Sequence, residues 1–221
     1  MAKSSLELIQ TRYRSSEATA IYDRRYSDVV GQFNYRAMRA ALRKALVHVP
    51  AGGRILDLPC GTGIFTWFLS HLGYKTLASD ISLEMLELTR ILKREAGPTP
   101  HFFQGDIFRL PLRDRALDAV LCMRFMNLVD RPMRVAAVEE LARVAGVVIV
   151  SYYHKYTLKH FSRMVRYKLG LRDAPNPRLS RRALVDEIKE TGLTLRALIS
   201  VAPMFSEAWI AVLEHPEGSK K

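Results

Sequence analysis

The sequence predicts an α/β protein built on a doubly wound, mainly parallel sheet of seven strands. Short apolar segments alternate with helical segments through the middle of the chain, which is typical of that class. The last two strand segments follow one another without a helix between them. At 221 residues the chain fits one such domain, and 48% hydrophobic with 25% charged residues exclude a disordered, collagen-like or coiled-coil protein.

Each expected strand is a short apolar run bounded by turn residues, and each expected helix carries a periodic apolar face. The strands are predicted at 54–58, 76–79, 101–104, 116–123, 144–151, 193–200 and 207–214. The helices are predicted at 5–14, 17–26, 34–48, 64–72, 82–95, 131–143 and 181–190. Ser82 is a suitable N-cap, and Gly73 and Gly192 are helix stops. We expect the last two strands to pair antiparallel at the sheet edge.

The positive charge is concentrated in one segment. The chain has 34 Lys+Arg and 22 Asp+Glu, a net charge of +12. Residues 152–182 contain nine basic residues and one acidic residue, whereas residues 51–151 contain twelve and eleven. A basic insert of this kind indicates an anionic partner: nucleic acid, a membrane surface or an acidic small molecule.

The cysteine content and the apolar runs bear on location. Cys60 and Cys122 are too few for a disulfide framework, which favours a reducing cytoplasm. The N-terminal residues do not resemble a signal peptide, and the longest apolar run, 144–150, is far shorter than a membrane span. We therefore expect a cytoplasmic protein that contacts a membrane only peripherally, if at all, and we predict no metal site.

The turn after the first predicted strand carries the strongest functional signal. It reads DLPCGTG over residues 57–63, at the strand end where open α/β sheets bind ligands. A dinucleotide fingerprint would need glycine where Thr66 stands, and no Walker A lysine is present. Asp57 would repel a pyrophosphate but attract an ammonium or sulfonium group. The turn therefore predicts a cationic nucleoside ligand without phosphates.

Four segments in this order resemble the class I S-adenosylmethionine-dependent methyltransferases. They are ILDLPCGTG at 55–63, LASDIS around Asp80, GDI at 105–107 and LDAVL at 117–121. The resemblance covers roughly residues 50–150. It implies a Rossmann-like fold, S-adenosylmethionine as methyl donor and S-adenosylhomocysteine as product. Pro59 departs from the glycine that the family often has there.

The resemblance also implies roles for individual residues. Asp57 and the carbonyls of 58–61 would lie near the methionine portion, and Asp80 would accept both ribose hydroxyls. Ile81 and Ile107 would sandwich the adenine. The residues expected to bind cofactor are Tyr22, Asp57, Pro59, Gly61, Thr62, Gly63, Asp80, Ile81, Met85, Asp106, Ile107, Met123 and Arg124. Structural alternatives stay open: loop and helix caps for the carboxylates, core packing for the isoleucines and a surface ion pair for Arg124.

A general base is needed only if the acceptor must lose a proton. His154, just after the fifth predicted strand, is the candidate, with Tyr152, Tyr153 and Tyr156 around it. The alternative is a solvated histidine at the start of the basic insert. The resemblance also implies an N-terminal helical lid, in which Tyr22, Tyr26 and Arg36 would close over the cofactor. The alternative is a lid that covers only the sheet edge.

Within the basic insert, residues 154–172 read as one amphipathic helix. Its expected apolar stripe is Leu158, Phe161, Val165 and Leu169, and its expected basic face is Lys155, Lys159, Arg163 and Arg166. Such a helix could pack as a lid over the substrate, lie on an anionic membrane or grip RNA phosphates.

These expectations divide the chain into an N-terminal helical lid (1–50), a cofactor-binding core (51–151), the basic insert (152–182) and a C-terminal helix with the strand pair (183–221). The leading hypothesis is a methyltransferase acting on a small-molecule or lipid-like acceptor. The alternatives are an RNA methyltransferase and a non-catalytic cofactor-binding or membrane-attached scaffold. The sequence leaves the oligomeric state open.

Overall fold

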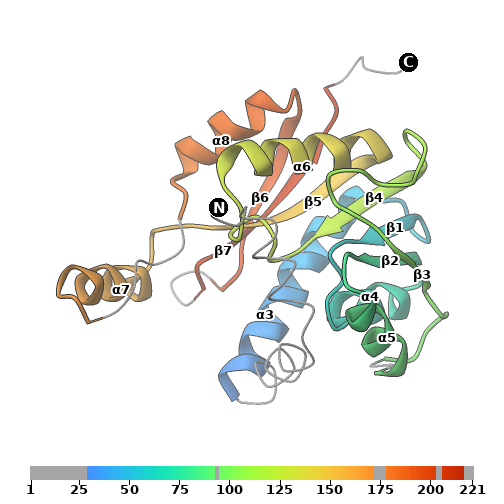
Figure 1. Ribbon diagram of the computed structural model, residues 1–221, viewed down its shortest axis with the longest axis horizontal. Helices are drawn as coiled ribbons and strands as arrows, with labels where there is room; N and C mark the ends of the chain where they lie inside the picture. Colours follow the sequence, from blue (N-terminus) through green and yellow to red (C-terminus); the bar gives the residue numbers. More distant parts are fainter. Residues whose placement is uncertain (1–28, 93–94, 172–177, 203–205, 217–221) are drawn as a thin grey trace, which may run out of the picture.

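The computed structural model describes residues 29–92, 95–171, 178–202 and 206–216. Its centre is one seven-stranded sheet in the order β3-β2-β1-β4-β5-β7-β6 (Figure 1). The strands are β1 (Arg54–Asp57), β2 (Lys75–Asp80), β3 (His101–Gln104), β4 (Leu117–Cys122), β5 (Ala145–Tyr153), β6 (Thr194–Ser200) and β7 (Ala208–Glu214). The predicted mainly parallel, Rossmann-like sheet of seven strands is therefore confirmed.

The antiparallel strand of this sheet is β7, and it lies one position in from the edge. It pairs antiparallel with β5 on one side and with β6 on the other, so that β6 is the outermost strand. Burial explains this order, because nearly every residue of β7 is buried whereas β6 is largely half-exposed. The predicted pairing of the last two strands is correct, and the refinement is that the antiparallel strand inserts beside β5.

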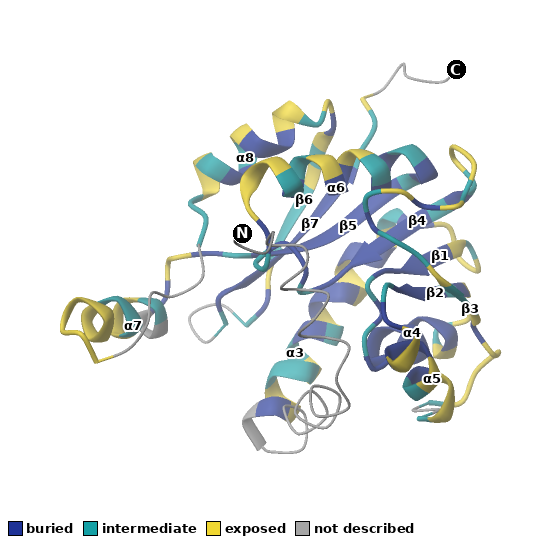
Figure 2. Ribbon diagram, in the orientation of Figure 1, coloured by how far each residue is buried: buried dark blue, intermediate teal, exposed yellow. Residues whose placement is uncertain are grey.

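Helices cover both faces of the sheet (Figure 1). On one face lie α3 (Val29–Ala45), α4 (Ile64–His71) and α5 (Leu83–Ile91), with the short 3-10 helix η1 (Leu46–His48) after α3. On the other lie α6 (Arg131–Val144) and α8 (Arg181–Glu190). Successive side chains along a strand point to opposite faces of the sheet. Ile55 packs in the core cluster with α3 and α4, and Leu56 packs in the cluster with α6 and α8. Buried residues accordingly line the strands and the inner helix faces (Figure 2).

The helix of the basic insert is shorter than expected. α7 runs from Leu158 to Lys168, with Thr157 as N-cap, and the chain leaves the helix at Gly170, whose φ is 69°. The preceding residues are held to the sheet instead, since the His154 N–H donates to the carbonyl of Glu207 at 2.7 Å. The prediction of a helix over 154–172 is therefore wrong at both ends. α7 projects from the body of the molecule (Figure 1).

One other predicted helix ends earlier than expected, and two lie outside the described residues. α5 ends at Ile91 rather than near Glu95, and the Glu95 carboxylate pairs with Arg39 of α3 at 2.8 Å. The expected helices at 5–14 and 17–26, with Tyr22 and Tyr26, lie outside the described residues. Within the ranges that are described, no helix combines the length and apolarity needed to cross a bilayer.

Candidate active site

The carboxyl ends of four neighbouring strands meet at one edge of the sheet. In the strand register Asp57, the last residue of β1, stands opposite Ala78 of β2 and Leu121 of β4. Asp80 ends β2 opposite Gln104 of β3. The topology thus brings together the loops that carry the predicted cofactor residues, as expected for a doubly wound sheet.

Asp57 is a buried carboxylate with one strong partner. Its Oδ2 atom accepts a hydrogen bond from the Thr66 hydroxyl at 2.6 Å, and the residue is 1% exposed. Burial raises the pKa of Asp57 to about 7; the Thr66 hydrogen bond lowers it in part, and the nearby charge of Asp80 raises it further. A carboxyl group of this kind is poised to ionise when a cation arrives.

Asp80 ties the glycine turn to the start of α5. Its Oδ2 accepts from the Gly61 N–H at 2.9 Å, and its Oδ1 accepts from the Ser82 N–H at 3.1 Å. Burial raises the pKa of Asp80, and these backbone N–H groups oppose that rise. A carboxylate has about four acceptor positions, so two hydrogen bonds leave capacity for hydroxyl groups of a ligand. Ser82 caps α5 as predicted, accepting from the Met85 N–H at 3.2 Å.

The turn itself requires glycine. Gly61 and Gly63 have φ values of 53° and 75°, in the left-handed region that favours glycine. A Cβ atom on Gly63 would lie 2.3 Å from Cγ2 of Thr89. The Thr89 hydroxyl in turn donates to the Gly61 carbonyl at 2.8 Å, and this hydrogen bond joins α5 to the turn. In the same turn, Pro59 follows a cis peptide bond and Thr62 is buried.

The expected adenine side is formed after β2 and β3. Asp106 Oδ1 accepts from the Phe108 N–H at 3.0 Å, which shapes the loop after β3. Ile81 is half-buried, and its carbonyl accepts from the Gln104 side-chain amide at 2.9 Å, a contact that the sequence analysis missed. Ile107 packs in the core cluster with Leu56 and Val120. Met85 and Met123 are also buried, and the contacts of all these residues with a cofactor stay predictions.

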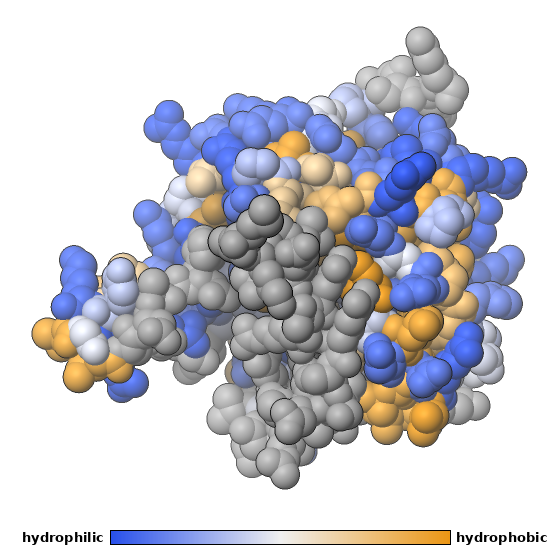
Figure 3. All heavy atoms as spheres, in the orientation of Figure 1, coloured by the Kyte–Doolittle hydropathy of each residue, from blue (hydrophilic) through white to orange (hydrophobic). Residues whose placement is uncertain are grey.

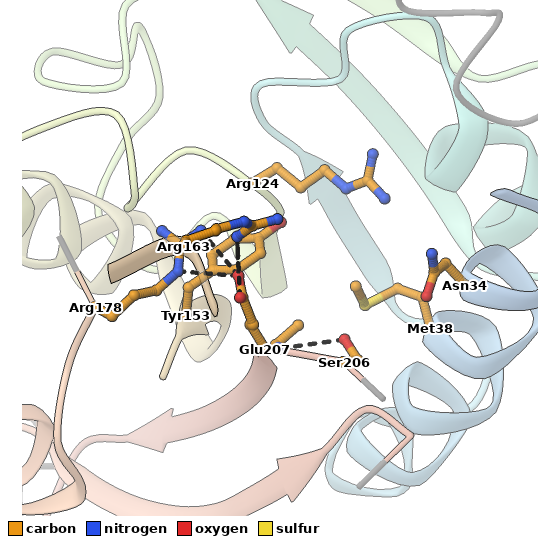
Figure 4. Close-up of a pocket in the computed structure, with 9 residues that line it drawn as sticks. Asn34, Met38, Arg124, Tyr153, Arg163, Arg178, Ser206 and Glu207 are labelled. Atoms are coloured by element: carbon orange, nitrogen blue, oxygen red, sulfur yellow. Dashed lines mark hydrogen bonds and ion pairs between the residues drawn. The ribbon is translucent and has the colours of Figure 1, made fainter. Parts of the chain in front are cut away.

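Beyond β4 and β5 the same edge holds a cavity of about 180 Å³ (Figure 4). Its walls come from α3, α7, the loop after β4, the end of β5 and the start of β7. The lining residues are Asn34, Met38, Arg124, Tyr153, Arg163, Arg178, Ser206, Glu207 and Ala208. Sequence reasoning singled out Arg124, Tyr153 and Arg163 but missed the others, since nothing local in the sequence links segments so far apart.

Glu207 holds two of these arginines. Arg163 Nη1 lies 2.7 Å from Glu207 Oε2, and Arg178 Nη2 lies 3.0 Å from the same oxygen. Arg163, which the sequence places on the basic face of α7, therefore turns toward Glu207 and the cavity. The physical reason is Glu207, whose side chain is only 6% exposed and needs cationic partners.

Arg124 has an unusual backbone. Its φ is 63°, a conformation that costs a non-glycine residue about 1–2 kcal/mol. Its N–H donates to the Ser151 hydroxyl at 2.6 Å, which fastens the loop after β4 to β5. Outliers of this kind concentrate at functional sites.

His154 lies in an aromatic stack beside the cavity. Its ring centroid is 4.5 Å from that of Trp209, and its Nδ1 accepts from the Tyr156 N–H at 3.2 Å. Burial lowers the pKa of His154, opposed by the charge of Glu207, so the ring is neutral at pH 7. It is absent from the cavity lining formed by the described residues, and its role as a base stays a prediction. Of the nearby tyrosines, Tyr153 faces the cavity while Tyr152 packs in the core beneath α6 and α8.

Comparisons with known proteins identify the family and the fold of the chain. Residues 55–146 match the family model described as a methyltransferase domain. The phosphatidylethanolamine N-methyltransferase of Cereibacter sphaeroides is 34% identical over 63% of this chain and 67% of its own length. A demethylmenaquinone methyltransferase of Mycobacterium sp. (strain KMS) is 34% identical over 55% of this chain and 56% of its own length, so this chain spans only part of that relative.

Among solved structures, magnesium protoporphyrin IX methyltransferase of Synechocystis PCC 6803, with S-adenosylhomocysteine bound, superposes with a TM-score of 0.75. It is 19% identical and covers 95% of this chain and 99% of its own, which shows a shared fold. The motif order, the sheet and the relatives lead to one conclusion: the chain belongs to the class I S-adenosylmethionine-dependent methyltransferases.

Proposed function

We propose that this protein transfers the methyl group of S-adenosylmethionine to a small-molecule or lipid-like acceptor. The observation that carries the proposal is the meeting of Asp57, Asp80 and the Gly61–Gly63 turn at the sheet edge that also holds the cavity past β4 and β5. Asp57, Asp80 and the turn suit a cationic nucleoside, and the cavity provides room for a group of the acceptor.

Within this proposal the described residues bind and orient the reactants. S-adenosylmethionine bound there would supply an electrophilic methyl group to a lone pair of the acceptor, with the electrons of the methyl–sulfur bond passing to the sulfur. Asp57 holds the cationic methionine end, and Asp80 accepts from the ribose hydroxyls. Asp106 accepts from the adenine amine between Ile81 and Ile107. Positioning and exclusion of water by these buried groups supply much of the acceleration.

The relatives favour a lipid-like acceptor. Two of them are named for phosphatidylethanolamine and demethylmenaquinone, which are both lipids. α7 supports the same class, because Phe161 and Leu169 are 67% and 66% exposed, and Arg166 and Lys168 are exposed beside them. Figure 3 shows apolar and charged residues side by side on this projecting segment.

Such a surface fits peripheral contact with an anionic membrane from the cytoplasmic side. Transfer of exposed phenylalanine and leucine side chains into a lipid interface lowers the free energy, whereas binding to RNA phosphates would leave these side chains in water. The membrane is therefore favoured over RNA as the partner of the basic insert.

Calorimetry with S-adenosylhomocysteine tests the proposal. We expect micromolar binding to the wild-type protein, and Asp80→Ala to weaken it at least tenfold through loss of the ribose hydrogen bonds, each worth about 1.5–3 kcal/mol when the acceptor is charged. Asp114→Ala is the matched control, since this carboxylate is exposed and lies in the loop that precedes β4, at the opposite sheet edge.

Methyl transfer to a panel of extracted lipids and small molecules, detected by mass spectrometry, then separates an enzyme from a non-catalytic scaffold. Absence of binding, or binding that Asp80→Ala leaves unchanged, would overturn the proposed function.

A further inference from the structure

The charge of the cavity past β4 and β5 is the starting point. Its lining, as far as the structure describes it, contains three arginines, Arg124, Arg163 and Arg178, and one carboxylate, Glu207. These four side chains come from four different segments of the chain. A small concave site with an excess of guanidinium groups concentrates anions.

Glu207 orders two of the arginines that line the cavity. Arg163 Nη1 lies within hydrogen-bond distance of both carboxylate oxygens, at 2.9 and 2.7 Å. Arg178 reaches Oε2 with Nε at 3.2 Å and with Nη2 at 3.0 Å. Burial tends to raise the pKa of Glu207, but the two guanidinium groups outweigh burial and lower it, so the carboxylate is ionised at neutral pH. One negative charge therefore holds two positive charges in place.

Arg124 approaches the cavity from another side. Figure 4 shows its side chain extending toward α3, across the cavity from the group of Arg163, Arg178 and Glu207. The left-handed backbone of Arg124, fastened by Ser151, fixes where this side chain starts. Arginine is the residue best shaped for carboxylates and phosphates, because its planar fork can donate two parallel hydrogen bonds.

The position of the cavity links it to methyl transfer. Arg124 comes three residues after Leu121, which pairs with Asp57 in the sheet. An anion held by Arg124 would therefore sit beside the proposed cofactor edge. Asn34, Tyr153 and Ser206 add neutral polar groups to the lining, while Met38 adds an apolar surface.

We propose that this cavity binds a negatively charged group of the methyl acceptor, a carboxylate or a phosphate ester, between Arg124 and the Arg163–Arg178 pair. The inference rests on the proposed methyltransferase function and narrows its acceptors to acidic molecules. It also gives α7 a role in acceptor recognition, since that helix contributes Arg163.

Calorimetry on the protein saturated with S-adenosylhomocysteine tests the proposal with four probes: hexyl phosphate, hexanoate, hexanol and hexylamine. We expect one or both anions to bind at least tenfold more tightly than hexanol and hexylamine. The tighter anion then identifies the phosphate or the carboxylate as the recognised group. Arg124→Gln and Arg163→Gln should each weaken anion binding about tenfold, the usual scale of a charge-assisted hydrogen bond. Arg166→Gln, on the exposed side of α7, should leave it unchanged.

Glu207→Gln separates recognition from structural damage. It removes the negative charge but keeps the shape, so anion binding should become tighter even if the protein becomes less stable. Equal binding of hexanol and the anions, equal losses in Arg163→Gln and Arg166→Gln, or weaker anion binding in Glu207→Gln would each overturn the proposal. If the wild-type protein did not bind S-adenosylhomocysteine at all, the proposed function itself would be contradicted.

Discussion

The Thr66 hydroxyl on α4 donates to Oδ2 of Asp57 at the end of β1, across 2.6 Å, and both residues are buried. This hydrogen bond favours the ionised carboxyl group, yet burial dominates and raises the pKa of Asp57 to about 7. The first strand and the helix after it thus create a carboxyl group whose charge changes at neutral pH.

The first prediction is that cofactor affinity depends on pH. Protonated Asp57 cannot attract the ammonium group of S-adenosylhomocysteine, so affinity should fall as the pH drops below about 7, approaching tenfold per pH unit. Above about pH 8 it should level off, and binding at pH 7 should release protons. Calorimetry in buffers of different ionisation enthalpy measures both effects. Asp57→Asn should remove the dependence, and constant wild-type affinity from pH 6 to pH 8 would contradict this role of Asp57.

The second prediction concerns the contact of the turn with α5. Gly63→Ala should destabilise the protein by about 1–3 kcal/mol and weaken cofactor binding, because the new methyl group meets Thr89 Cγ2 at 2.3 Å while φ is 75°. A second substitution, Thr89→Ser, removes Cγ2 of Thr89 but keeps the hydroxyl that donates to the Gly61 carbonyl. Part of the lost stability and cofactor affinity should therefore be recovered.

Gly73→Ala is the matched control for Gly63→Ala. Gly73 also has a positive φ, of 85°, but its added Cβ meets no atom within 4 Å. Thermal unfolding and calorimetry should therefore show a smaller loss of stability and unchanged cofactor affinity. An equal effect of the two substitutions on affinity would mean that the Thr89 contact is unimportant.

Local signals in the sequence predict the sheet and the turn after β1 well. The apolar runs and the DLPCGTG turn at 57–63 place β1, the turn and α4 almost to the residue. The cavity is different, because Glu207 meets Arg163 and Arg178 only after β7 has inserted beside β5. Periodicity places Arg163 on a basic helix face, but it does not show that a buried carboxylate 44 positions away pairs with this residue. Long-range ion pairing of this kind has no local signature.

The third prediction tests His154. If it acts as a base, His154→Phe should lower kcat about 100-fold or more for acceptors that must lose a proton. The phenyl ring should keep the stack on Trp209, so cofactor affinity and Tm should change little. Tyr156→Phe is the control for the aromatic contact. Unchanged kcat in His154→Phe would show that the ring has a purely structural role.

The fourth prediction compares a buried and an exposed ion pair between α6 and α8. Arg134 and Glu187 are nearly inaccessible and make two hydrogen bonds, of 2.9 and 2.7 Å. Glu187→Ala should lower the free energy of unfolding by about 3–5 kcal/mol, because it leaves a buried guanidinium unpaired. Glu190→Ala, which breaks the exposed pair with Arg131, should cost at most about 1 kcal/mol. Urea unfolding measures both, and equal losses would contradict the argument from burial.

The fifth prediction concerns α7 and membranes. Replacing Phe161 and Leu169 together by serine should reduce binding to vesicles containing anionic lipid at least about 100-fold, since each side chain contributes roughly 1.5–3 kcal/mol on burial. Arg166→Glu with Lys168→Glu should also reduce binding, and more so at low salt, because these residues are exposed and do not belong to the Glu207 cluster that includes Arg163.

Ile91→Ser is the matched control, since Ile91 is 78% exposed at the end of α5. Vesicle flotation measures all of these variants. If the apolar double variant still floats like the wild-type protein, α7 faces water in the working enzyme, and its contribution to function is limited to what Arg163 does at the cavity.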